Sequence, residues 1–197
     1  MNLRERWLVH RLQQRDERAF REMVRTYEAQ VFNLVFRMLG NRQEAEDLAQ
    51  DVFLTVFKSI DSFRGDSKLS TWLYRIAVNT CKNRYKYLAR RRHNALQPLD
   101  EASEREAAAQ DQGGPTIPLQ AHLSRPDHLV EGRALEAALQ RELENLEEEH
   151  RLLIVLRDVQ GLSYQEIAAI TQLPEGTVKS RLHRARMALK ERLEKYM

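Results

Sequence analysis

Two stretches of the chain combine aromatic, amide and cationic side chains, the three kinds that read nucleic acids. The first runs from a polar loop with one glycine, residues 61–69, into a helix expected from Ser70 or Thr71 to about Arg92. Aromatic rings stack on bases, amides bond base edges and cations neutralise phosphates. Six cations of this helix occur with no acid among them: Lys82, Arg84, Lys86, Arg90, Arg91 and Arg92. The pattern predicts a DNA-reading surface.

The second stretch, residues 176–186, lies near the end of the chain and has the pattern of a helix-turn-helix. Ser163 and Glu166 have the spacing of a capping box that starts a short helix, residues 171–176 form a turn, and a basic helix is expected from Thr177 to about Tyr196. Four side chains opposite the apolar stripe of that helix are candidate base readers: Lys179, Ser180, His183 and Arg184. Arg181 and Arg186 suit phosphates or surface ion pairs better. The alternative is a solvated basic face.

Helices carry the rest of the chain, so the expected fold class is all-α. The sequence has 197 residues, 31% of them charged and only seven glycines, and it lacks long alternating β-branched runs. Apolar residues recur at helical spacing over 2–39, with a break near Arg15 and Asp16, and again over 43–60. The pattern disappears from about 97 to 128, where glycines and prolines predict a linker, and returns near Asp127.

Charge and cysteine content limit the function classes. The net charge is only +3, but acids dominate 131–149 and bases dominate 82–92 and 179–195, which suggests nucleic acid on some faces and a protein partner on others. The glutamates of 142–149 are best interpreted as a solvated face. The single cysteine, Cys81, favours a reducing cytosol, and no signal peptide or membrane span is found.

No catalytic constellation is present in the sequence, so we expect no enzyme, no cofactor and no metal. Cys81 lies on the apolar side of its helix without ligand-spaced partners, which argues against zinc. Trp72 is better interpreted as a core residue than as a stacking platform.

Five segments, in this order, resemble the extracytoplasmic-function (group IV, sigma-E-like) sigma factors of bacterial RNA polymerase. They are residues 44–54, 63–67, 71–80, 158–169 and 176–186. The resemblance implies two small helical domains joined by a flexible linker: sigma domain 2 at 1–95, the linker at 96–127, and the helix-turn-helix sigma domain 4 at 128–197. It implies a cytoplasmic protein that binds core RNA polymerase and directs promoter-specific initiation.

The resemblance also implies roles for individual residues. The clamp helices of the polymerase β′ subunit would bind Asp47, Gln50, Asp51 and Leu54. The minus-10 element, with a base flipped into the 61–69 loop, would meet Phe63, Arg64, Ser67, Tyr74, Asn79, Lys82, Asn83 and Lys86. The minus-35 element would meet Thr177, Lys179, Ser180, Arg181, His183 and Arg184.

The resemblance further implies that domain 4 contacts the β flap of the polymerase. An anti-sigma factor, often membrane-anchored in this family, would hold the protein inactive. The protein itself would not insert into the membrane. An autonomous helix-turn-helix regulator is the alternative, but it leaves residues 44–92 unexplained. A DNA-processing enzyme is a further alternative, which the missing catalytic constellation disfavours.

Overall fold

Helices make up all the regular structure of the described residues, 3–95 and 131–196 of a computed structural model. The first group of helices is α1 (Leu3–Gln13), α2 (Glu17–Leu39), α3 (Arg42–Ser59), the 3-10 turn η1 (Ile60–Ser62) and α4 (Leu69–Ala95). The second is α5 (Glu131–Glu144), α6 (Glu148–Ile154), the π-helical turn η2 (Val155–Val159), α7 (Tyr164–Thr171), α8 (Glu175–Leu193) and η3 (Glu194–Tyr196). The expected linker at 96–127 lies outside the described residues.

Polar caps at the predicted breaks separate the first helices. The Asp16 carboxylate accepts bonds from the backbone N–H groups of Arg18 and Ala19 and so starts α2. The left-handed backbone of Gly40 ends that helix, and the side chain of Asn41 caps α3. The break near residue 16 and the stop at 40–41 are therefore confirmed.

Two boundaries differ from the expectation. α4 begins at Leu69 rather than at Ser70 or Thr71, because the Leu69 N–H is bonded by the carboxylate of Glu5 from α1, a long-range partner that local sequence does not reveal. α8 begins at Glu175, two residues before Thr177. Ser163 and Glu166 do form the expected capping box of α7.

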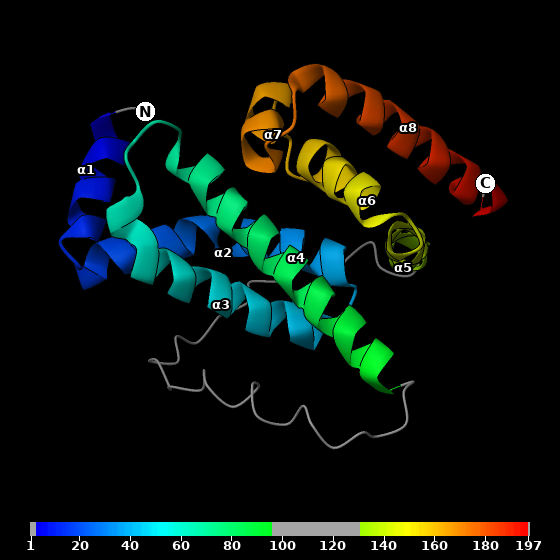
Figure 1. The fold of residues 1–197 in the computed structure, drawn as a ribbon, viewed down its shortest axis with the longest axis horizontal. Coiled ribbons are helices and arrows are strands. Elements are labelled where there is room, and N and C mark those ends of the chain that lie inside the picture. The colour runs from blue at the N-terminus through cyan, green and yellow to red at the C-terminus, as the bar shows by residue number, and fades with distance from the viewer. Residues whose placement is uncertain (1–2, 96–130, 197) are drawn as a thin grey trace.

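The second group of helices, domain 4, packs directly against the first, domain 2. In Figure 1, α4 crosses α2 and α3, and α5–α8 lie on one side of that assembly, with α5 near the end of α2 and α7 near the first half of α4. Buried residues of both groups belong to one contiguous core, so the two domains share apolar surface.

A buried arginine joins the domains at this interface. Arg151 of α6 is 8% exposed, and it donates to the Tyr85 hydroxyl at 2.7 Å and to the carbonyl oxygen of Met38 in domain 2. It also donates to the carbonyl oxygens of Glu144 and Leu146 in its own domain. Because its acceptors come from both sides, the guanidinium fixes the relative position of α2, α4 and α6.

One acidic residue departs from the expected solvated face. Glu142 is 2% exposed, and its carboxylate accepts from the Tyr196 hydroxyl at 2.9 Å and pairs with Lys195 at 2.8 Å. These contacts lower the pKa of Glu142, chiefly through the Lys195 hydrogen bond. Glu142 thus attaches the end of the chain to α5, whereas Glu144, Glu147 and Glu149 are exposed as expected.

A glycine pair tests the interdomain contact. Gly40, with φ of +77°, faces the Glu144 side chain of the other domain, and a Cβ atom at position 40 would collide with it. Gly161, with φ of +69°, has nothing within 4 Å of that position. Either replacement by alanine places an L-residue in the left-handed backbone conformation, which costs about 1–2 kcal/mol of folding free energy. We expect Gly40→Ala to lower the melting temperature slightly more than Gly161→Ala, because the flexible Glu144 side chain must turn away and give up its bond with Gln140, and we expect Glu144→Ala to recover part of the difference. Equal losses in denaturation scans would contradict the contact.

Candidate nucleic-acid interface

The 61–69 loop places its polar side chains outward and its aromatic inward. Arg64 is exposed and Ser67 is half-buried. Phe63 is only 5% exposed, and its ring packs on Trp72 with centroids 5.3 Å apart. Trp72 is half-buried against the core, which agrees with its interpretation as a packing residue. In this conformation Phe63 holds the loop to the core, and Arg64 and Ser67 are left to face a ligand.

Helix α1 holds the same loop at both of its ends. Glu5 Oε1 accepts from the Leu69 N–H at 2.6 Å, and Gln13 Nε2 donates to the Phe63 carbonyl at 3.2 Å. After α1, the Arg15 guanidinium pairs with Asp61 at 2.5 Å. The loop is therefore positioned by residues about 50 or more positions earlier in the chain.

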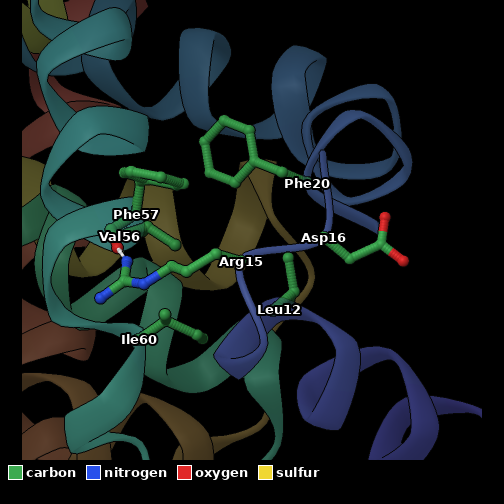
Figure 2. Close-up of a pocket in the computed structure, with 7 residues that line it drawn as sticks. All are labelled: Leu12, Arg15, Asp16, Phe20, Val56, Phe57 and Ile60. Atoms are coloured by element: carbon green, nitrogen blue, oxygen red, sulfur yellow. Dashed lines mark hydrogen bonds between the residues drawn. The ribbon is translucent and has the colours of Figure 1, made fainter. Parts of the chain in front are cut away.

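Arg15 occupies a constrained position in the turn between α1 and α2. Its φ of +61° is left-handed, a conformation that L-residues rarely adopt. Its guanidinium carbon lies 4.9 Å from the centroid of the Phe57 ring, and Figure 2 shows the side chain reaching to the Phe57 carbonyl that it bonds. The hollow around it has a volume of about 10 Å³, room for one water at most, so this is a structural joint and not a ligand site.

Helix α4 has a free polar face and a covered face. Asn79, Asn83 and Lys86 are exposed and Lys82 is half-buried, which leaves these four predicted base and phosphate contacts available. Tyr74, a fifth predicted contact, is 4% exposed and donates its hydroxyl to Gln160 of domain 4 at 2.9 Å. Burial raises the pKa of Tyr74 to about 12, so the hydroxyl stays neutral. In this arrangement the ring of Tyr74 has no free face for a base.

Domain 4 covers the first turns of α4. Lys68, at the end of the loop, pairs with Glu166 at 2.8 Å, and Arg75 donates to the Ala169 carbonyl of α7 at 3.0 Å. The Lys68 hydrogen bond, followed by the Ser163 backbone, lowers the pKa of Glu166 to about 2. Glu166 is therefore ionised at neutral pH, and the pair persists there. Sequence reasoning missed this use of Lys68, Arg75 and Gln160, because an interdomain partner leaves no local pattern.

The candidate base readers of α8 all face solvent. Lys179, Ser180, His183 and Arg184 are exposed, whereas Val178, Leu182 and Ala185 are buried, as the stripe predicted. Lys179 pairs with Glu175 one turn earlier, at 2.7 Å, and Thr177 is half-buried. Arg181 pairs with Glu149 and Arg186 with Asp158, so these two form surface ion pairs here. The arrangement presents hydroxyl, imidazole and cationic side chains to solvent along the first half of the helix.

The acidic face of α3 is open as well. Asp47 and Asp51 are exposed, and Gln50 and Leu54 are half-buried beside them. Partial burial, followed by the like charge of Asp47, raises the pKa of Asp51. The repulsion that Asp47 exerts on the Asp51 carboxylate is relieved when a cation approaches, which suits a basic partner.

The part of the chain that the structure describes offers little for other chemistries. Within it, no group of three or more histidine, cysteine or acidic side chains is arranged to hold a metal ion. Nor does any described helix have the length and apolarity needed to cross a membrane.

Comparison with known proteins matches both parts of the chain. The family model of Sigma-70 region 2 matches residues 23–92, and that of Sigma-70, region 4 matches residues 136–189. The ECF RNA polymerase sigma-E factor of Escherichia coli K12 is 39% identical over 187 residues, 95% of this chain and 93% of that protein. The chain belongs to the ECF sigma factors. It is a non-enzymatic initiation factor that directs transcription.

Further relatives agree with this membership. The RNA polymerase sigma-H factor of Pseudomonas aeruginosa is 36% identical over 187 residues, 95% of this chain and 92% of that protein. The Bartonella quintana sigma factor RpoE, solved with the anti-sigma factor NepR, aligns at TM-score 0.60 and 25% identity over 89% of this chain and 96% of that chain. CnrH, solved with the cytosolic domain of CnrY, aligns at TM-score 0.67 and 22% identity over 96% of this chain and 97% of that chain, which supports the fold.

The burial of Cys81 gives a chemical test of the α4 environment. This single cysteine is 1% exposed, and burial raises the pKa of its thiol from 9.0 to about 12. At pH 8 the thiolate fraction should therefore fall about a thousandfold, since each pKa unit is a factor of ten. We expect a thiol reagent to modify Cys81 far more slowly in the native protein than in denaturant. Mass spectrometry measures the rate of modification, and comparable rates in the native and the denatured protein would contradict the burial of Cys81.

Proposed function

We propose that this sigma factor reads the two promoter elements with separate faces of its two domains. Domain 2, residues 1–95, binds the minus-10 element through the exposed face of α4 and the 61–69 loop. Domain 4, residues 128–197, binds the minus-35 element through α8, and the segment 96–127 links them. The observation that carries the proposal is the presence of two solvent-facing, acid-poor polar faces, on α4 and α8, in a chain of this family.

At the minus-10 element, Asn79 and Asn83 contact base edges, and Lys82, Lys86 and Arg64 contact phosphates or the flipped base. Ser67 lies in the same loop and contributes a hydroxyl. Phe63 and Tyr74 are buried in the described arrangement, so their proposed contacts require a rearrangement of the loop and of domain 4.

Protein partners account for the remaining faces. Asp47, Gln50, Asp51 and Leu54 bind the β′ clamp helices of core RNA polymerase, and domain 4 binds the β flap. An anti-sigma factor, often membrane-anchored in this family, holds the protein inactive in the cytoplasm. The relative RpoE, solved with its anti-sigma factor, supports this last partner.

Footprinting with and without core polymerase tests the proposal. Protection of both promoter elements only when core enzyme is present is expected of a sigma factor. Protection by the free chain at a single site would instead indicate an autonomous helix-turn-helix regulator, an activity that the exposed α8 face alone would allow.

Charge reversal of the acidic face of α3 should abolish polymerase binding. In Asp47→Lys with Asp51→Lys, both side chains are exposed, so the fold should survive while a basic partner is repelled. Glu17→Lys with Glu191→Lys, two exposed sites on α2 and α8, changes the net charge equally and serves as control. Co-purification of core polymerase with the double variant at wild-type yield would remove the assignment.

Removal of the Asn79 amide should impair minus-10 recognition in a sequence-dependent way. Asn79 is exposed beside Asn83 and Lys82. Loss of base-edge hydrogen bonds costs about 1–3 kcal/mol. Transcription from a set of minus-10 variants measures the effect of Asn79→Ala. An equal loss on all variants would mean that Asn79 has no base to read.

Two cations of α8 should behave differently at the minus-35 element. The planar guanidinium of Arg184 suits guanine, so Arg184→Ala should reduce the specificity of the protein at one base pair. Lys179→Ala should weaken binding to all minus-35 sequences alike, and it should reduce the number of counterions released on binding, read from the salt dependence of the affinity, by about one. Transcription from minus-35 variants at two salt concentrations separates these effects. Wild-type behaviour of both variants would show that α8 does not read DNA in this way.

A further inference from the structure

We propose that α1 determines how the 61–69 loop reads the minus-10 element, with Glu5 and Gln13 as positioning residues. This inference rests on the proposed function of that loop. Glu5 bonds the N–H of Leu69 at 2.6 Å and Gln13 bonds the carbonyl of Phe63 at 3.2 Å, so the five residues between those two positions are held at both ends.

The first contact also sets where α4 begins. The Leu69 N–H is one of the free donors at a helix start, and in the described part of the chain its acceptor is a carboxylate from another helix rather than a local cap. Glu5 also lies close enough to Lys68 to act on its charge. A shift of Glu5 would therefore change the start of α4 and the direction of the loop that precedes it. A flipped base is selected by the shape of its pocket, so such a shift changes selection.

Transcription with core polymerase from a set of minus-10 promoters tests the role of α1. Glu5→Ala and Gln13→Ala should each reduce discrimination between the preferred and the other bases at one or two positions by about tenfold. Glu5→Gln keeps an oxygen acceptor and should remain close to wild type. Glu17→Ala, an exposed acid on α2, is the matched control.

If Glu5 and Gln13 only stabilised the fold, their replacement would lower the melting temperature and would reduce transcription from all promoters by the same factor. Such a uniform loss, or wild-type discrimination in Glu5→Ala and Gln13→Ala, would overturn the inference. If the wild-type chain itself fails to select promoters with core polymerase, the proposed function fails instead, so the two failures are distinguishable.

A second inference is carried by the interdomain contacts: the geometry points to an autoinhibitory closure in which domain 4 covers part of the minus-10 surface of the same chain, the loop end and the first turns of α4 with Tyr74. It too rests on the proposed function. The contacts involve the loop end and the first half of α4: Lys68 with Glu166, Tyr74 with Gln160, and Arg75 with the Ala169 carbonyl. Gln160 further donates to the Gln30 carbonyl of α2 at 3.2 Å.

The spacing of the promoter elements makes this arrangement incompatible with promoter binding. The elements lie about 25 base pairs apart, which is about 85 Å of B-form DNA at 3.4 Å per base pair. Here α4 packs on α7, and α7 on α8. Helices in contact lie 8–10 Å apart, so the axes of α4 and α8 are within about 20 Å. Domain 4 must therefore leave α4 before both elements can be bound.

Several polar contacts of the closure can be removed without altering a proposed DNA or polymerase residue and without removing the buried Arg151. On the domain 4 side, Gln160 bonds Tyr74 and Gln30, and Gln140 and Glu136 bond Arg37 of α2 at 3.1 and 2.8 Å. The triple variant Glu136→Ala, Gln140→Ala, Gln160→Ala removes these bonds. Gln14→Ala with Glu17→Ala, in the exposed turn after α1 and at the exposed start of α2, changes the net charge equally and serves as control.

Binding of a single-stranded minus-10 oligonucleotide to the free, full-length protein tests the closure. We expect the triple variant to bind at least about fivefold more tightly than the wild type and the control, because the covered surface is released. Equal affinity of the triple variant and the control, with native helicity by circular dichroism, would overturn it. Promoter-specific transcription with core polymerase by both variants would leave the proposed function in place in either case.

Discussion

The two faces of α4 are the constraint on which the rest of the structure depends. One face carries Asn79, Asn83 and Lys86 in solvent, while the stripe through Tyr74, Val78 and Cys81 is buried. A helix that presents amides and cations to DNA, as we propose for α4, can be stabilised only from its other side. Domain 2 supplies part of that support and domain 4 the rest, so α4 belongs both to a reading surface and to the interdomain contact.

The polar groups at this contact determine which arrangement is held. Apolar surface alone would allow domain 4 to slide, but the buried Arg151 has acceptors in both domains and loses them if the domains shift. Around it, pairs such as Lys68 with Glu166 are exposed, where ion pairs contribute little each. The buried arginine thus specifies the geometry of the proposed closure. The exposed ion pairs around it are weak enough for a protein or DNA partner to replace them.

Sequence predicted local features well and long-range partners not at all. The Asp16 cap, the Gly40 stop, the Ser163–Glu166 capping box and the exposed face of α8 all follow from residues within a few positions of one another. The early start of α4 depends on Glu5, and the burial of Tyr74 depends on Gln160, 86 positions away. Glu142 likewise has an ordinary surface pattern until the end of the chain supplies its partners.

The distance between the two domains tests the central claim most directly. Dyes on Arg25→Cys in α2 and Arg192→Cys in α8, both exposed sites, would report it by energy transfer, since the native Cys81 is buried. We expect a short distance between the dyes in the free protein and a separation greater by several tens of ångströms when core polymerase and promoter are added. An unchanged distance in the promoter complex would contradict it.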